Sequence, residues 1–194
     1  MRIIAGQRRG HKIDGPPDRR TRPTSDMVRE SIFNILRDLV ADRPVIDLFA
    51  GTGALGLEAL SRGASHATFI ERRRENTALI RRNLAALRFE GLGTVVTGDA
   101  YRWARGFEPE GSGAVVMFLD PPYDEYKQHP DRLRDLLADL AARLPAGSVL
   151  LVESGGRLDN TILPDPNSWD LRRYGDTHLA FKTCGEEERM TLEP

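Results

Sequence analysis

From residue 44 onward, short apolar segments alternate with helix-forming segments, and this alternation limits the fold more than any other feature of the sequence. The pattern predicts five buried strands, at residues 45–49, 66–70, 94–97, 114–119 and 148–153. It predicts helices at residues 24–39, 54–61, 73–87, 100–105 and 130–144. Strands that alternate with helices form right-handed crossovers and a parallel sheet covered on both faces. The sequence therefore predicts an α/β fold.

Two segments outside this alternation are predicted to be antiparallel hairpins. Residues 169–174 and 178–182 flank Gly175-Asp176-Thr177, which is a turn signal. Residues 3–13 have strand-like ends around glycines and predict a small N-terminal β-hairpin extension. Five parallel strands with a closing C-terminal hairpin give a Rossmann-like, mostly parallel seven-stranded sheet. This is the sheet of class I S-adenosylmethionine-dependent methyltransferases, and it differs from the six-stranded dinucleotide-binding form.

The charge of the chain is unevenly distributed. The 194 residues carry a net charge of −1, but residues 1–22 carry +5, so the remainder carries −6. A cluster of cations on an acidic body is typical of a local polyanion-binding surface, although a solvated tail is the simpler alternative. We divide the chain into a basic arm, 1–23, and a methyltransferase domain, 24–194. The candidate phosphate contacts in the arm are Arg2, Arg8, Arg9, Lys12 and Arg22.

Several features bear on the cellular setting. The apolar runs are too short to span a bilayer, and the N-terminus lacks the apolar stretch of a secretory signal. The single cysteine, Cys184, excludes an internal disulfide and is typical of a reducing compartment. The four histidines lack metal-ligand spacing. We therefore expect a cytoplasmic monomer with neither a metal nor a membrane partner.

The segment from Asp47 to Gly56 contains a G-x-G-x-x-G pattern that follows a strand and opens a helix. Its glycines permit a tight turn, a close ligand approach and close packing of helix on strand. Nicotinamide and flavin enzymes use the same pattern, so it does not identify a cofactor alone. Asp47 immediately before the loop would repel a pyrophosphate, whereas it would attract the ammonium of a methionine moiety. The pattern thus favours S-adenosyl-L-methionine.

Two further acids follow the next strands. Glu71 lies 24 residues after Asp47 and can accept both hydroxyls of a ribose, and Asp99 can accept the adenine amine. Each of these acids, taken alone, could be an ordinary exposed carboxylate at the end of a strand. Together they lie at the carboxyl ends of successive parallel strands, where open sheets bind ligands. The predicted cofactor-binding residues are Asp47, Phe49, Gly51, Gly53, Glu71, Asp99 and Ala100.

The motif Asp120-Pro121-Pro122-Tyr123 directly follows the fourth predicted strand, and these four residues are the predicted catalytic set. An exocyclic amine on a base is a poor nucleophile because its lone pair is delocalised. The Asp120 carboxylate and the Pro121 carbonyl could hold both amine hydrogens, and consecutive prolines stiffen these acceptors. Tyr123 offers an aromatic face to an extruded base. The motif indicates amine methylation without choosing a base.

The sequence resembles the RsmD family of bacterial methyltransferases over nearly its whole length. The resemblance rests on Arg2 to Gly6, Arg22-Pro23-Thr24, Asp47 to Ala64 and the Asp120 to Tyr123 loop. It implies methyl transfer from S-adenosylmethionine to the N2 amine of a guanine in 16S ribosomal RNA. It also implies that the basic N-terminal hairpin contacts ribosomal RNA and that the substrate is the small ribosomal subunit, assembled or assembling.

Other functions remain open from the residues alone. An adenine-N6 methyltransferase acting on DNA or RNA uses the same loop, although the DNA enzymes usually need a separate target-recognition region. A non-catalytic RNA-binding module could keep the fold, and a small-molecule methyltransferase is disfavoured by the basic arm.

Overall fold

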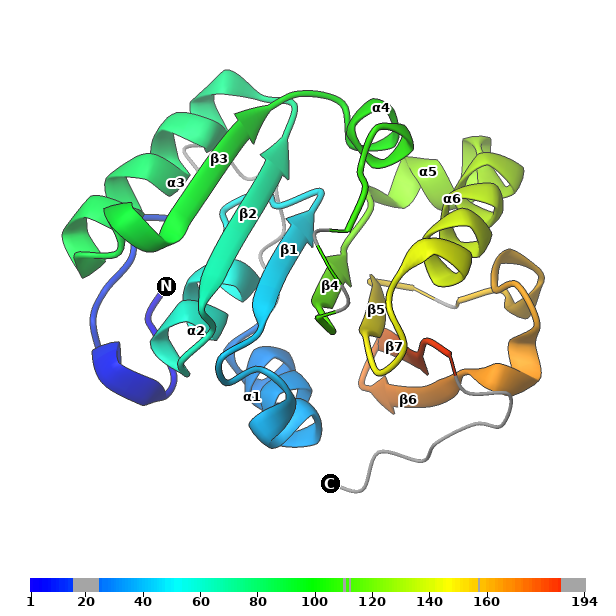
Figure 1. Ribbon diagram of the computed structural model, residues 1–194, viewed down its shortest axis with the longest axis horizontal. Helices are drawn as coiled ribbons and strands as arrows, with labels where there is room; N and C mark the ends of the chain where they lie inside the picture. Colours follow the sequence, from blue (N-terminus) through cyan, green and yellow to red (C-terminus); the bar gives the residue numbers. More distant parts are fainter. Residues whose placement is uncertain (16–24, 110, 112, 157, 186–194) are drawn as a thin grey trace.

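The computed structural model describes residues 1–15, 25–109, 111, 113–156 and 158–185, and these form a single sheet with helices on both faces (Figure 1). The seven strands lie in the order β3-β2-β1-β4-β5-β7-β6. Strands β1 to β5 pair in parallel, while β7 pairs antiparallel with both β5 and β6. The strands are β1 Pro44–Leu48, β2 His66–Glu71, β3 Gly93–Thr97, β4 Val116–Leu119, β5 Val149–Ser154, β6 Asp170–Tyr174 and β7 Thr177–Thr183.

The helices divide between two hydrophobic layers because successive strand residues point to opposite faces of the sheet. Val45 and Phe118 pack in the layer of α1, α2 and α3, whereas Ile46 and Met117 pack in the layer of α4 and α6. The α-helices are α1 Asp26–Leu36, α2 Ala54–Ser61, α3 Arg74–Leu87, α4 Ala100–Arg105, α5 Tyr123–Gln128 and α6 Pro130–Arg143. Short 3₁₀ turns cover Gly6–Arg8, Arg37–Leu39, Glu90–Leu92, Asn160–Ile162 and Pro166–Ser168.

This arrangement confirms the predicted fold class, and the local signals explain its element boundaries. Ser25 caps α1, since its Oγ accepts a hydrogen bond from the Val28 amide at 3.2 Å. Gly56 packs α2 onto β2 so closely that a Cβ there would lie 2.3 Å from the Phe69 ring. None of the helices within the described residues combines the length and the apolar character that a membrane span requires.

The N-terminal segment, residues 1–15, folds back on itself as a minimal hairpin. Its single antiparallel bridge joins Arg2 to Lys12, and Ile3 and Ile13 are buried. The segment lies beside α2 and α3, on the opposite side of the molecule from β6 and β7 (Figure 1). It therefore packs on the core instead of extending from it. The predicted boundary at residue 23, and Arg22 with it, lie outside the described residues, so the two-part division stays a prediction.

A buried carboxylate attaches this segment to the domain. Glu58 of α2 is fully buried and accepts hydrogen bonds from the amides of Ile4 at 2.8 Å and Ala5 at 3.0 Å. Arg62 donates to the same carboxylate, and the fully buried Arg29 lies with its Nε 3.8 Å away. Arg29 in turn donates to the Arg2 carbonyl at 2.7 Å. Removing one member of such a set leaves buried charge and donors without partners, which is costly.

We predict that Glu58→Ala lowers the free energy of unfolding by about 3–5 kcal/mol, because it leaves buried donors unpaired. The same change should expose residues 1–15 to limited proteolysis before the rest of the chain. Urea denaturation and timed trypsin digestion measure the two effects. Glu30→Ala, on the exposed side of α1, is the matched control. Equal stability of the two variants would contradict the assigned role of Glu58.

Candidate active site

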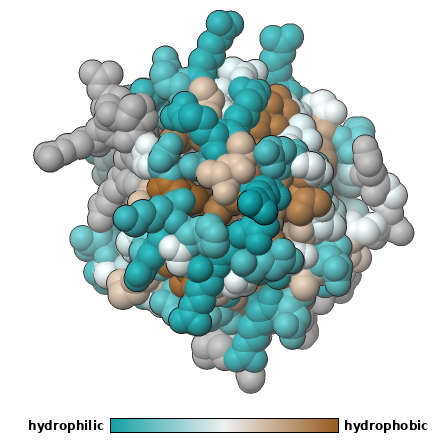
Figure 2. All heavy atoms as spheres, turned by 90° about the vertical axis from the view of Figure 1, so that its left-hand side faces the viewer, coloured by the Kyte–Doolittle hydropathy of each residue, from teal (hydrophilic) through white to brown (hydrophobic). Residues whose placement is uncertain are grey.

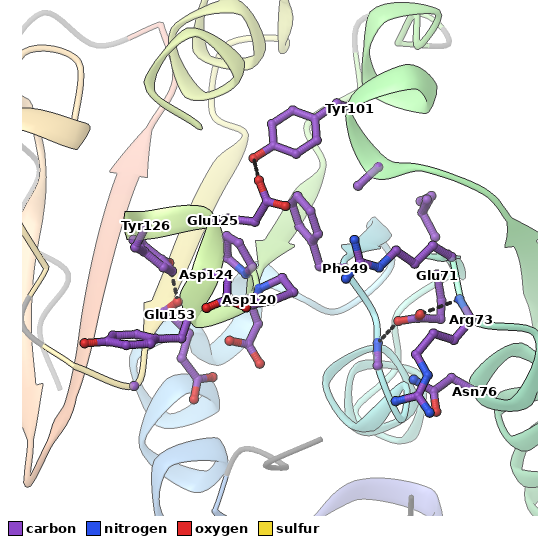
Figure 3. A pocket seen from close by; sticks show the side chains of 18 of the residues that line it. Phe49, Glu71, Arg73, Asn76, Tyr101, Asp120, Asp124, Glu125, Tyr126 and Glu153 are labelled. Atoms are coloured by element: carbon purple, nitrogen blue, oxygen red, sulfur yellow. Dashed lines mark hydrogen bonds between the residues drawn. The ribbon is translucent and has the colours of Figure 1, made fainter. Parts of the chain in front are cut away.

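A cleft of about 780 Å³ opens at the carboxyl edge of the parallel strands (Figure 3). Its volume lies within the roughly 300–1,000 Å³ typical of small-molecule sites. Residues at or just beyond the carboxyl ends of all five parallel strands contribute to its lining, including Gly51, Glu71, Asp99, Asp120 and Glu153. Figure 3 shows Glu71, Arg73 and Asn76 on one side of the pocket, and Asp120 and Glu153 on the other. The sheet topology therefore brings most of the predicted site residues into one cavity.

The glycine-rich loop after β1 has a tight backbone conformation. Phe49 has a φ of +69°, which is unusual for a bulky residue, and Gly51 and Gly53 have φ values of +53° and +76°. Glu71 holds this loop through its Oε2, which accepts from the Gly51 amide at 2.9 Å. The Phe49 ring meets the Tyr101 ring edge to face at 5.5 Å. Strained backbone of this kind concentrates at ligand sites, where the surrounding contacts hold it in place.

Asp47 and Gly53 lie behind this loop and are not among the residues that line the cleft. Asp47 is buried, and its Oδ2 accepts from the Gly56 amide in the first turn of α2 at 3.0 Å. The pKa of Asp47 is raised to about 7, chiefly by burial and also by the negative charges of Glu71 and Glu153, while the hydrogen bond from Gly56 lowers it. The structure thus gives Asp47 a supporting position under the loop, and its direct contact with a cofactor stays a prediction.

The other predicted cofactor residues, Phe49, Gly51, Glu71, Asp99 and Ala100, all line the cleft. Each Glu71 oxygen accepts one backbone amide, from Gly51 and from Arg73, and a carboxylate oxygen can accept a second hydrogen bond. Asp99 caps α4 by accepting from the Arg102 amide at 2.8 Å, while its side chain stays 47% exposed. Both acids therefore keep acceptor capacity on the cleft side.

These contacts fit an adenosine-containing cofactor. Asn76 of α3 is 2% exposed and lines the same side of the cleft, yet its Oδ1 has no hydrogen-bond partner among the described residues. A buried acceptor without a partner is costly unless a ligand supplies the donor. Glu71, Asp99 and Asn76 would hold the polar groups of the cofactor, and Phe49 and Ile70 offer apolar contacts.

Asp120-Pro121-Pro122-Tyr123 joins β4 to α5 at the opposite side of the cleft, and all four residues line it. Pro121 is buried, whereas Tyr123 is 57% exposed. The Tyr123 ring therefore offers a free face, with the Lys127 ammonium 4.6 Å from its centroid. The last residue of the motif belongs to a helix, because α5 starts at Tyr123 directly after Pro122.

Asp120 lies in an electrostatically unusual place. Burial raises the pKa of its carboxyl well above the ordinary range, and the negative charges of Glu153 and Asp47 raise it further. Among the described residues, none donates a hydrogen bond to the Asp120 carboxylate. Its oxygens therefore remain available to accept hydrogen bonds from a ligand, and the ionised form is a stronger base than an ordinary aspartate.

Besides Asn76, our sequence interpretation did not select Glu153, Tyr126 or Tyr101, which the structure brings into the site. Glu153, the next-to-last residue of β5, lies beside Asp120, and Tyr126 donates to the Glu153 carbonyl at 2.6 Å. Tyr101 donates to the Glu125 carboxylate at 2.8 Å across the rim. Glu153 could have been found by the rule that selected Glu71, because it too ends a predicted parallel strand. The two tyrosines carry no comparable sequence signal.

Within the part of the chain that the structure describes, no group of three or more His, Cys, Asp or Glu side chains could hold a metal ion. Cys184 is buried, and burial raises the pKa of its thiol to about 11. It lies outside the cleft lining.

The fold and the cleft define a class I S-adenosylmethionine-dependent methyltransferase. Residues 1–183 match the family model described as Conserved hypothetical protein 95, and the chain belongs to this family. It is 38% identical over 173 residues to ribosomal RNA small subunit methyltransferase D of Escherichia coli K12, covering 89% of this chain and 83% of that one. It is 39% identical over 127 residues to the putative rRNA methyltransferase YlbH of Bacillus subtilis, covering 66% and 69%.

Solved structures give the same result. The putative methyltransferase yhhF from Escherichia coli matches with a TM-score of 0.75 at 32% identity, covering 96% of this chain and 99% of that one. The putative methylase HI0767 from Haemophilus influenzae matches with a TM-score of 0.70 at 27% identity, covering 93% and 96%. The predicted membership of the RsmD family, the predicted fold and the predicted cofactor, S-adenosylmethionine, are thereby confirmed.

The raised pKa of Asp47 has a consequence for stability. The pKa is about 7 in the folded chain, whereas the ordinary value of 3.8 applies once the chain unfolds, so the folded state binds this proton more tightly. The resulting stabilisation is complete below pH 3.8 and is lost as the pH rises through 7. Asp47→Asn keeps an acceptor for the Gly56 amide without the buried charge.

We therefore predict that the melting temperature of Asp47→Asn, relative to wild type, increases between pH 5 and 8, by on the order of 5 °C. Differential scanning calorimetry without cofactor measures this difference. Asp38→Asn, which replaces an exposed carboxylate, is the control. A pH-independent difference for Asp47→Asn would mean that Asp47 is ionised throughout this range.

Proposed function

We propose that this chain transfers a methyl group from S-adenosylmethionine to the exocyclic N2 amine of a guanine in 16S ribosomal RNA of the small ribosomal subunit. The observation that carries the chemistry is the open Asp120 carboxylate, fixed by two prolines at the edge of the cofactor cleft. The RNA substrate is supported by relatives named as ribosomal RNA small subunit methyltransferases. A ribosomal RNA substrate would put the enzyme in the cytoplasm.

In this mechanism the chain acts mainly by positioning. The cofactor, when bound, supplies an electrophilic methyl group on its sulfonium sulfur. The Asp120 carboxylate and the Pro121 carbonyl accept the two amine hydrogens and hold the nitrogen lone pair toward that methyl group. The methyl group would come from the bound cofactor, and the amine nitrogen that receives it would release one hydrogen as a proton. Burial raises the pKa of Asp120, so its ionised form is well suited to accept that proton.

The extruded base would stack on the exposed Tyr123 ring. Its 57% exposure leaves one face free, and α5 fixes the ring at its first residue. The target base must leave its RNA helix for this reaction, because the amine cannot reach the cleft while the base is stacked and paired.

The RNA contact is proposed for the N-terminal segment. Arg2, Arg9 and Lys12 are exposed there, and Figure 2 shows this side of the molecule as mostly hydrophilic. Arg8 differs from these three. Its Nε donates to the Leu87 carbonyl at the end of α3 at 2.7 Å, and its guanidinium lies over the Phe89 ring. We therefore expect Arg8 to stabilise the segment and the other three to contact phosphates.

The central experiment incubates the protein with methyl-labelled S-adenosylmethionine and, separately, small ribosomal subunits, free 16S ribosomal RNA and duplex DNA. Label in subunits or ribosomal RNA, mapped by mass spectrometry to one N2-methylguanosine, is the expected result. Label at an adenine N6, or in DNA alone, would support the adenine methyltransferase alternative. Absence of both label and cofactor binding would favour the non-catalytic RNA-binding module.

We predict that Asp120→Asn lowers kcat by roughly 100- to 1,000-fold, because one amide hydrogen-bond acceptor replaces an ionised carboxylate. Isothermal titration calorimetry should show cofactor affinity within about threefold of wild type, since Asp120 lies on the acceptor side of the cleft. Asp131→Asn in the first turn of α6 is the matched control. Undiminished methyl transfer by Asp120→Asn would exclude the proposed mechanism.

We predict that Arg9→Ala with Lys12→Ala weakens RNA binding and lowers the slope of log affinity against log salt by about 1.5–2, through loss of two phosphate contacts. Filter binding from 50 to 200 mM salt, roughly the range over which such contacts dominate, measures the slope. Arg105→Ala with Arg134→Ala removes two exposed arginines from the opposite face of the sheet and serves as control. An unchanged slope would count against this surface.

A further inference from the structure

A second carboxylate, that of Glu153, lies beside Asp120 in the cleft. The two residues follow directly on the paired positions Leu119 and Val152 of β4 and β5. Glu153 is only 6% exposed and lines the cleft, and its charge is felt at both Asp120 and Tyr126. Its place in the cleft lining puts a charged hydrogen-bond acceptor beside the bound ligand.

The sheet order separates this acid from the cofactor side. Glu71 and Asp99 lie at the carboxyl ends of β2 and β3, on one side of β1 in the sheet. Asp120 and Glu153 lie at the carboxyl ends of β4 and β5, on the other side. Figure 3 shows the same separation, with Glu71 and Asn76 across the pocket from Asp120 and Glu153. Glu153 therefore lies on the side of the cleft where the proposed function places the accepting base.

The position of Glu153 relative to Asp120 is rigidly fixed. Its backbone pairs with Leu179 of β7, and its carbonyl accepts the Tyr126 hydroxyl at 2.6 Å. Tyr126 belongs to α5, which begins in the Asp-Pro-Pro-Tyr motif. The same tyrosine thus connects the loop of Asp120 to the strand of Glu153, and the two carboxylates are held as one unit.

Guanine and adenine differ at the atom beside the amine. Guanine has a donor, N1–H, next to its N2 amine, whereas adenine has an acceptor, N1, next to its N6 amine. An ionised carboxylate accepts the first and repels the second, and a site built for a donor rejects an analogue that lacks it. A carboxylate in this position therefore distinguishes the two bases where the Asp-Pro-Pro-Tyr motif does not.

We propose that Glu153 selects guanine: its carboxylate accepts a hydrogen bond from N1–H while Asp120 and the Pro121 carbonyl hold the N2 amine. This inference rests on the proposed function, and it makes Glu153 a specificity-determining residue of that site.

The test uses 2-aminopurine, which keeps the N2 amine of guanine but has an acceptor at N1. The guanine mapped in the experiment above is replaced by 2-aminopurine through splint ligation, and the RNA is reconstituted into small subunits. Wild type should show a kcat/KM for guanine roughly 10- to 100-fold above that for 2-aminopurine, as expected for one charge-assisted hydrogen bond. Glu153→Gln, whose amide can donate to N1, should lower this ratio at least tenfold.

The ratio, unlike the absolute rate, is insensitive to a purely structural defect. Glu125→Gln, at a cleft acid already bonded to Tyr101, should keep the wild-type ratio. An unchanged ratio in Glu153→Gln would overturn the inference. Equal wild-type kcat/KM values for guanine and 2-aminopurine would also overturn it, and this measurement does not depend on the folding of any variant.

If wild type labels no guanine in ribosomal RNA, the proposed function itself fails. That result differs from the two above, in which guanine is still methylated.

Discussion

Five parallel strands bring their carboxyl ends to one edge of the sheet, and each of these ends carries an acid: Asp47, Glu71, Asp99, Asp120 and Glu153. Negative charges gathered at one edge repel one another and oppose folding unless partners compensate them. Backbone amides compensate Asp47, Glu71 and Asp99, at the starts of α2, α3 and α4. Asp120 receives no such donor from the described residues. The Asp120 carboxylate can therefore accept hydrogen bonds from a substrate.

The same edge divides the cleft by function. Acids held by backbone amides support the glycine-rich loop and retain capacity for the hydroxyls and amine of the cofactor. Asp120 and Glu153 lie on the other side of the cleft, where we propose that the accepting base binds. The division follows from strand order alone, because β1 lies between β2 and β4 and the chain reverses direction across the sheet at β1. The order of the strands in the sheet therefore determines on which side of the cleft each of these residues lies.

Sequence periodicity predicts the strands to within about two residues, since buried strands are nearly continuous apolar runs. It does not predict α5, because Tyr123–Gln128 is a short polar segment without an apolar stripe. Charge composition indicates a basic arm at the N-terminus, but the segment packs on Glu58, a buried acid inside the apolar α2. Nothing in the local sequence distinguishes that glutamate from an exposed one. Glu153 carries the strand-end signal, but its pairing with Asp120 depends on β4 and β5 being neighbours.

The acidic edge also explains which cofactor suits this Rossmann-like sheet. The G-x-G-x-x-G pattern alone would accommodate a pyrophosphate, but Asp47 lies directly beneath that loop and Glu71 holds it. Negative charge there opposes an anionic ligand and favours a cationic methyl donor. Methyl transfer would remove the sulfonium charge, so a cleft lined by carboxylates would hold the demethylated product less strongly than the donor. The electrostatic field that favours binding of the donor would therefore also favour release of the product.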